Sequence, residues 1–191
     1  MQQLRGTDLK RLNRTWRRRG GSRLGLVLEG IASPFNVGAM VRTSAVMGVG
    51  ELYLVTGTAS PRSPKAQKTA MGTDRYLRWR EYDDLPAAVA AARSDGFRIV
   101  GLELADEAKP LADLDLVRDV CLLVGHEDRG ITPAGLALCD DVGYIPQLGR
   151  VGSLNVATAT AIACYEVRRQ GFAASDSTMD PSDVDDEDLD E

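Results

Sequence analysis

The sequence predicts an α/β protein in which helices cover both faces of a mostly parallel β-sheet. Apolar runs of strand length alternate with stretches of helical pattern along most of the 191 residues. Strands that are apolar on both faces are typical of a parallel sheet covered on both sides. The length suits one domain with short extensions, and 43% hydrophobic with 5% aromatic residues is ordinary for this class.

The expected elements follow one another in an order that fits this class. Asn36 and Ser153 are the expected N-caps of the first and last helices, because such side chains accept hydrogen bonds from the first helical turn. Residues 60–74, rich in Ser, Pro and Lys, are predicted to form a loop with one short helix. The predicted strands are residues 23–30, 51–57, 97–104, 119–125 and 141–146, and the predicted helices are residues 36–48, 83–96, 132–139 and 153–170.

The last predicted helix is almost uniformly small or apolar between Leu154 and Cys164. A helix that is apolar all round is a buried one, so Asn155 in its first turn is expected to be buried as well. Gly149 and Gly152 precede this helix, and we expect them to admit the close approach of another segment of the molecule.

Composition argues against several classes of protein. No apolar run approaches the roughly 20 residues that span a bilayer, and the N-terminal residues lack the apolar segment of a secretory signal. Cys121, Cys139 and Cys164 lie among apolar residues without metal-ligand spacing, and His126 is the single histidine. We therefore expect reduced, buried cysteines in a cytoplasmic protein without a metal site and without a membrane partner.

The net charge of -5 conceals a strong asymmetry between the ends. Residues 1–23 carry eight basic residues against one acid, whereas residues 172–191 carry nine acids and no base. We therefore divide the chain into a basic arm (1–22), a central domain (23–171) and an acidic tail (172–191) that is expected to be disordered. The arm indicates a polyanionic partner, the alternative being an ordinary surface helix with a solubilising tail. The sequence leaves open whether the tail folds back on the arm and competes with nucleic acid.

Three predicted strand-to-helix loops carry unusual residues at the sheet edge where ligands bind in this class. In the first, EGIASPFNVGAMVRT, Arg42 is a cation in an otherwise apolar second helical turn. Arg42 either extends over a surface edge or stands at the mouth of a pocket, facing an anion or polarising a hydroxyl.

The second loop, LLVGHEDRGITPAG, places Glu127 between two glycines. Gly125 and Gly130 allow the backbone to approach a ligand closely. His126 is expected to be an exposed loop residue rather than a catalytic one.

The third loop, YIPQLGRVGSLNVATATAIACYE, offers Ile145, Leu148 and Leu154 as the walls of an apolar slot. Neither a P-loop nor a dinucleotide-binding glycine pattern is present, which argues against a triphosphate or NAD as the ligand.

Together these segments resemble the three motifs of the SpoU/TrmH family of SPOUT-class, S-adenosylmethionine-dependent RNA ribose 2′-O-methyltransferases. The patterns N-x-G-A-x-x-R-T (36–43), L-x-G-x-E-x-x-G-I (123–131) and I-P-x-x-G-x-x-x-S-L-N-V (145–156) occur in the family's order. The resemblance runs from about residue 23 to residue 170 and leaves out the arm and the tail. Ala157 departs from the pattern, because many relatives carry serine there.

The resemblance implies a deep trefoil knot within about residues 120–170, S-adenosylmethionine bound in that knot, and a homodimer. It implies no metal. It assigns the catalytic site to Arg42, Asn36, Glu127, Ser153 and Asn155. It assigns cofactor binding to Leu104, Gly125, Ile145, Leu148 and Leu154, of which Leu104 lies outside the motifs.

The implied reaction moves a methyl group from a sulfonium to a ribose 2′-oxygen, so the reactants must be aligned and the hydroxyl must lose its proton. In the family, the arginine of the first motif helps the 2′-hydroxyl to lose its proton, and Arg42 occupies that position here. Arginine is too basic for an ordinary general base, so we expect it to orient the hydroxyl and stabilise the alkoxide, together with a substrate phosphate.

The basic arm bears on the choice of RNA. The expected phosphate contacts, which carry no sequence selection, are Arg14, Arg17, Arg18 and Arg19. Trp16 either stacks on a base or packs the arm onto the domain, the second being favoured. A short basic N-terminal helix resembles the tRNA branch that methylates a D-loop guanosine. Ribosomal RNA is the alternative substrate, and a non-catalytic RNA-binding knotted module is the alternative function.

Overall fold

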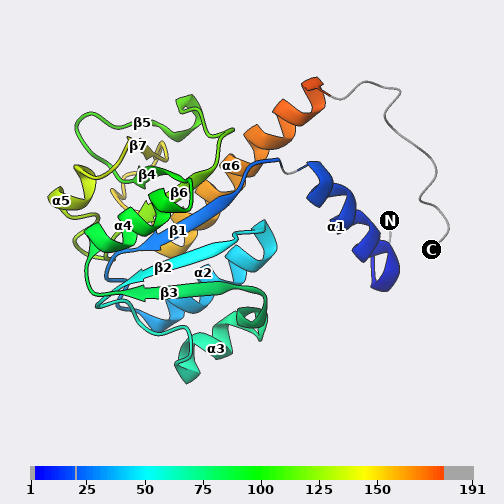
Figure 1. The fold of residues 1–191 in the computed structure, drawn as a ribbon, viewed down its shortest axis with the longest axis horizontal. Coiled ribbons are helices and arrows are strands. Elements are labelled where there is room, and N and C mark those ends of the chain that lie inside the picture. Colours follow the sequence, from blue (N-terminus) through cyan, green and yellow to red (C-terminus); the bar gives the residue numbers. More distant parts are fainter. Residues whose placement is uncertain (1–2, 20, 179–191) are drawn as a thin grey trace.

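The computed structural model describes residues 3–19 and 21–178 (Figure 1). In this part of the chain seven strands form one sheet in the order β3-β2-β1-β6-β4-β7-β5, and every neighbouring pair is parallel. The mostly parallel α/β class is therefore confirmed. The strands are β1 (Leu24–Leu28), β2 (Glu51–Val55), β3 (Arg78–Tyr82), β4 (Arg98–Leu102), β5 (Lys109–Pro110), β6 (Val120–Val124) and β7 (Asp141–Tyr144).

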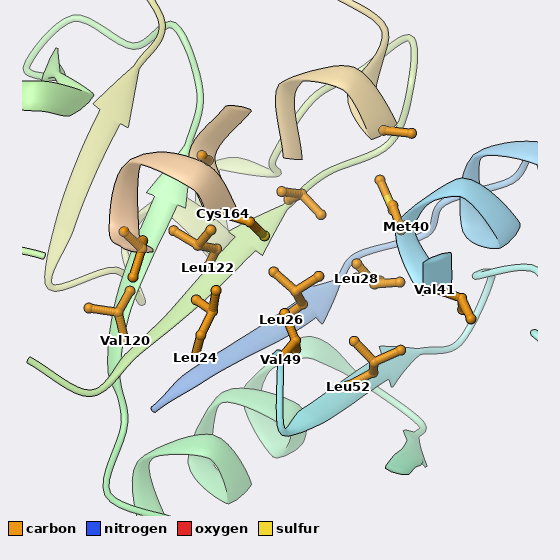
Figure 2. Packing of buried hydrophobic residues seen from close by; sticks show 14 of the residues in the cluster. Leu24, Leu26, Leu28, Met40, Val41, Val49, Leu52, Val120, Leu122 and Cys164 are labelled. Atoms are coloured by element: carbon orange, nitrogen blue, oxygen red, sulfur yellow. The ribbon is translucent and has the colours of Figure 1, made fainter. Parts of the chain in front are cut away.

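Helices pack on both faces of the sheet because its central strands are apolar on both sides. Every residue of β1 and β6 is buried. Leu24 and Leu26 belong to a core shared with α2 and α6, whereas Val27 belongs to the core under α4. Figure 2 shows the first core, with Met40 of α2 and Cys164 of α6 near the leucines of β1 and β6. The helices are α1 (Gly6–Arg19), α2 (Pro34–Met47), α3 (Pro64–Ala70), α4 (Leu85–Ser94), α5 (Pro133–Leu136) and α6 (Val156–Thr178), with 3-10 turns η1 (Thr73–Tyr76) and η2 (Leu111–Asp113).

Both helix starts that the sequence assigned to a cap are shifted. The N-cap of α2 is Ser33, whose hydroxyl accepts from the Asn36 N–H at 3.4 Å, and Pro34 takes the first helical position that suits proline. Asn36 is therefore inside the helix. At α6 the cap is Asn155 instead of Ser153, because the Asn155 Oδ1 accepts from the backbone N–H groups that open the helix.

The strands β3 and β5 are absent from the sequence prediction. β3 lies at the edge of the sheet and is only half-covered, with Arg78, Arg80 and Glu81 exposed, so it has no apolar run. Charged residues on an edge strand oppose pairing with another chain. β5 comprises two residues, too few for any pattern.

Helix α6 buries one stripe instead of its whole surface. Ala163, Cys164 and Val167 are fully buried, whereas the Ile162 and Tyr165 side chains are 41% and 57% exposed. The expectation of a helix buried all round is therefore wrong for a single chain.

The residues in front of α6 are open as well. Asn155 is exposed, contrary to expectation. A Cβ built at Gly149 would have its nearest neighbour at 3.9 Å, the Val151 nitrogen, and one at Gly152 would have no neighbour within 4 Å. Neither glycine is needed for close packing within one chain.

The three cysteines are free thiols, as expected. Cys121 and Cys164 are buried, whereas Cys139 is half-buried. Among the described residues, no group of three or more His, Cys, Asp or Glu side chains is arranged to hold a metal ion.

The basic arm forms α1, which has no buried residue. The Trp16 and Phe172 rings lie 4.8 Å apart, and the Ser175 hydroxyl donates to the Arg19 carbonyl at 2.7 Å. Trp16 therefore packs the arm against α6. That helix continues to Thr178, so residues 172–178 of the expected tail are helical. The rest of the tail, residues 179–191, lies outside the described residues.

Arg168 fixes α6 to the body of the domain. Its guanidinium donates to the carbonyls of Met47, Gly48 and Ser22, each at 2.7 Å. These carbonyls lie at the end of α2 and just before β1, so one side chain ties three segments together. No described helix has the length and apolarity needed to cross a membrane.

Candidate active site

Glu127 lies at the centre of a hydrogen-bonded group that joins the loops of the first two motifs. Its Oε1 accepts from the Ser33 N–H at 3.0 Å and from the Asn36 Nδ2 at 2.8 Å. Its Oε2 accepts from the Ala32 N–H at 3.0 Å. Ala32 and Ser33 precede α2, so the carboxylate lies at the N-terminus of that helix, where the helix dipole stabilises negative charge.

Asn36 extends this group to the third motif. The Asn36 Oδ1 accepts from the Asn155 Nδ2 at 3.0 Å. The Asn155 Oδ1 in turn accepts from the N–H groups of Ala157 and Thr158, at 3.0 and 3.1 Å. The Glu127–Asn36–Asn155 triad thus contains one side chain from each of the three segments that the sequence singled out.

The surroundings of Glu127 keep its carboxyl ionised. Burial raises the pKa of this half-buried group, but hydrogen bonds from Asn36, Ser33 and Ala32 outweigh burial and hold the pKa below its ordinary value. A carboxylate that accepts three hydrogen bonds is suited to positioning the start of α2, and is poorly suited to removing a proton from a substrate at neutral pH.

Two further carboxylates hold the Glu127 loop, and neither was predicted from the sequence. Glu103, directly after β4, accepts from the Ile131 N–H at 2.9 Å. Glu29, directly after β1, accepts from the Thr132 hydroxyl at 2.6 Å and from its N–H at 3.2 Å. The sequence signal is an acidic residue immediately following an apolar strand.

The glycines of this loop have a steric role. His126 and Gly130 exchange two backbone hydrogen bonds, of 3.1 and 2.8 Å. A Cβ at Gly125 would collide with the Gly130 backbone, and Gly130 itself has a φ of 65°. His126 is half-buried instead of exposed, and its Nδ1 accepts from the Asp128 N–H at 3.1 Å, so the imidazole stabilises the turn.

A pocket of about 330 Å³ lies beside this loop. Four of the five expected cofactor-binding residues line it, as do Glu127 and Ser153; the four are Leu104, Gly125, Ile145 and Leu154. Leu148 does not line the pocket, because its side chain is fully exposed. The apolar slot therefore has Ile145 and Leu154 as walls but not Leu148.

Arg42 is absent from the residues that line this pocket. It lies six residues after Asn36, about 240° around a helix of 3.6 residues per turn, and so faces another direction. Its side chain is exposed, and its Nη1 contacts the Met71 sulfur. One chain therefore brings Asn36, Glu127 and Asn155 together but leaves Arg42 apart.

The arginines expected to bind RNA all lie on α1 and outside the pocket. Arg14, Arg17 and Arg18 are exposed, and Arg19 is half-exposed over the Trp16 ring at 4.5 Å. The described structure thus separates a small pocket at the carboxyl end of the sheet from a basic helix.

The sequence matches the model of the SpoU rRNA Methylase family over residues 23–165. The chain belongs to this family. This SpoU-family chain is 34% identical over 147 residues to the tRNA (guanosine(18)-2′-O)-methyltransferase of Escherichia coli (strain K12), covering 77% of this chain and 63% of the relative. It is 32% identical to the 23S rRNA (guanosine-2′-O-)-methyltransferase RlmB of Acinetobacter baylyi, over 76% of this chain and 59% of the relative.

The chain thus spans less than two thirds of the length of these two curated relatives. Among solved structures, the SpoU methyltransferase AviRb from Streptomyces viridochromogenes in complex with AdoMet matches with a TM-score of 0.73 and 27% identity. That match covers 80% of this chain and 62% of AviRb. The family resemblance inferred from the three motifs is confirmed.

Proposed function

We propose that this SpoU-family chain is an S-adenosylmethionine-dependent RNA ribose 2′-O-methyltransferase whose substrate is a guanosine in tRNA. The observation that carries the proposal is the Glu127–Asn36–Asn155 triad, in which the three motifs meet beside the pocket. Both curated relatives are named as guanosine 2′-O-methyltransferases, one of tRNA and one of 23S rRNA. The basic α1 favours tRNA, and the similarity to the 23S enzyme makes ribosomal RNA the second candidate.

The pocket fits the cofactor in size and chemistry. Its volume of about 330 Å³ falls within the range of small-molecule sites. Leu104, Ile145 and Leu154 would hold the adenine between apolar walls, while Gly125 lets backbone polar groups come close. S-adenosylmethionine supplies a methyl group that its positive sulfur activates. Ser153 and Asn155 would shape the third loop around it.

Arg42 is proposed to orient the ribose 2′-hydroxyl and to stabilise the alkoxide as its proton leaves. It lies on an exposed stripe of α2 between Phe35 and Val46, whose side chains are 56% and 72% exposed. Large apolar side chains exposed on one face of a helix support an interface there. We therefore place the homodimer interface on this face, where a second subunit would enclose Arg42 and complete the site. Sedimentation equilibrium at the mass of a single chain would contradict this assembly.

The proposal also includes the knot, the domain limits and the location. A trefoil knot within about residues 120–170 is proposed on the similarity to SpoU-family structures, and it would include the third motif, whose Asn155 bonds to Asn36. Residues 23–171 would form the methyltransferase domain, and residues 1–22 would bind RNA through Arg14, Arg17, Arg18 and Arg19. A cytoplasmic location matches such a substrate.

Single-turnover methylation of a tRNA transcript tests the catalytic proposal, because it separates chemistry from product release. Arg42→Ala should slow methyl transfer by about 10²- to 10³-fold while leaving the fold and cofactor affinity unchanged, the loss typical of a removed preorganised donor. Arg42→Lys should restore little, because an ammonium lacks the planar fork of guanidinium. Arg118→Ala is the matched control, since Arg118 is exposed and pairs only locally with Asp115.

The possible results separate the candidates. A near-normal rate for Arg42→Ala would remove Arg42 from the mechanism. Methylation of 23S rRNA but not of tRNA would favour the second substrate. Binding of RNA without methylation of either would indicate the non-catalytic knotted module.

A further inference from the structure

Helix α1 presents two opposite stripes along its length. Leu9, Leu12 and Trp16 recur at the spacing that places them on one side of an α-helix. Lys10, Arg14 and Arg17 recur at positions i, i+4 and i+7 on the opposite side. We call these three side chains, with Arg11 beside them, the basic stripe.

No ion pair joins the basic stripe to an acid within residues 3–19 and 21–175, whose side chains are described, and α1 packs substantially only against α6. Asp8 is the single acid of the helix. Four like charges on about two helical turns repel one another, so the helix is more stable when an anion lies along this side.

Phe172 and Ser175 of α6 lie beside Trp16 and Arg19 at the C-terminal end of α1, and beyond this contact the two helices diverge (Figure 1). The Trp16–Phe172 ring contact and the hydrogen bond from Ser175 to the Arg19 carbonyl fix this arrangement. The chain therefore leaves α6 at Thr178, three residues after its contact with the C-terminal end of α1.

The residues that follow α6 have the complementary charge. Residues 179–191 contain eight acids and no base. Thirteen residues extend to at most about 44 Å, whereas a 14-residue helix is about 21 Å long, so the segment can run along the whole stripe. Tethering beside the stripe gives the segment an effective concentration on the order of millimolar.

We propose that the acidic segment 179–191 occupies the basic stripe of α1 when RNA is absent and that RNA must displace it. This inference rests on the proposed RNA substrate, but the contact between tail and arm does not. The segment would compete with the phosphates of RNA for the basic stripe. An RNA that also contacts the methyltransferase domain would displace the segment more readily than a polyanion that contacts only α1.

Salt-dependent binding of a tRNA transcript tests the competition. The full chain is compared with a chain ending at Thr178 and with a full-length variant in which the eight tail acids are replaced by Asn and Gln. Both changed chains should bind about tenfold more tightly at 0.1 M salt if the segment occupies the stripe nine-tenths of the time. They should also show a steeper salt dependence of RNA affinity. In the full chain the displaced tail takes up counterions as RNA releases them, so the net release is smaller than in the changed chains. The difference should close at 0.5 M salt.

A second set of variants, with the basic stripe removed, separates displacement of a bound tail from a general change in net charge. In chains carrying Lys10→Ala, Arg14→Ala and Arg17→Ala, RNA affinity should fall, and removing residues 179–191 should no longer raise it. An equal gain in both backgrounds would refute a tail bound to this stripe, because it would show that the acids repel RNA at long range.

Carbodiimide cross-linking tests the contact without RNA and without methyl transfer. Lys10 is the lysine of α1, so an amide between Lys10 and a carboxyl of residues 179–191, found by mass spectrometry at low salt, is the expected product. Added tRNA should suppress it. Mixing isotopically light and heavy chains shows whether the amide joins one chain or two. Absence of any such cross-link at low salt, together with unchanged RNA affinity after truncation, would overturn the proposal.

Discussion

Replacing Glu127 by Gln probes the triad at its centre. The carboxylate accepts three hydrogen bonds of 2.8 to 3.0 Å. A glutamine oxygen can still accept from Ser33 and Asn36, but its amide NH₂ would face the Ala32 N–H, donor against donor. A hydrogen bond to a charged group contributes about 1.5–3 kcal/mol. Because Ala32 is exposed, its N–H can hydrogen-bond to water instead, so we expect a loss at the lower end of this range. Glu127→Gln should therefore lower the free energy of unfolding by about 1.5–2 kcal/mol at pH 7.

The pH dependence gives a second signature of the same residue. The pKa of Glu127 is lower in the folded chain than in the unfolded one, so its contribution is present above the unfolded pKa and is lost as pH falls through the folded pKa. Urea unfolding of wild type and variant should thus differ at pH 7 and converge toward pH 3. Glu107→Gln, an exposed change of equal charge, is the control. Equal stability of wild type and Glu127→Gln at pH 7 would refute the positioning role.

Two further predictions concern the loop and the thiols. Gly125→Ala should abolish binding of S-adenosylmethionine in calorimetry and lower the melting temperature, because its Cβ has no room beside the Gly130 backbone; unchanged affinity would contradict the packing. Burial raises the pKa of Cys164 to about 12 and that of Cys139 to about 11, so both thiols are protonated at pH 8. Aromatic disulfide reagents should label them slowly in the native chain and rapidly in urea, and rapid native labelling would contradict this burial.

The fold was predictable wherever a strand is buried on both faces. β1, β2, β4 and β6 are largely buried runs rich in apolar residues, which is the pattern that predicted them, whereas β7 was predicted although only Gly143 in it is buried. β3 was not predictable, because an edge strand half-exposed to water alternates charged and aromatic residues without an apolar run. The N-cap of α2 was predicted wrongly because two good cap residues lie close together, Ser33 and Asn36. Pro34, which is suited to the first helical turn, favours Ser33.

The candidate site was predictable in its members but not in its arrangement. The motifs supplied Asn36, Glu127 and Asn155, and the structure joins them by hydrogen bonds. Glu29 and Glu103 were missed because their partners lie about 100 and 28 residues away, a relation that no local pattern contains. Arg42 had the right chemistry for the site, yet the helix turns it away from Asn36, so the sequence motif alone does not place it.

The order of strands in the sheet has a consequence for how the chain folds. β1 is paired on one side with β6, and the backbone of Arg23 is bonded to the Asp119 carboxylate across a sequence separation of 96 residues. The centre of the sheet is therefore completed by a contact between segments far apart in the sequence. Bringing them together costs loop-closure entropy before the burial of apolar residues can offset that cost. A chain emerging from the ribosome exposes the apolar edge of β1 until residue 124 has appeared. During that interval no native strand covers this edge, so the incomplete chain is prone to aggregation.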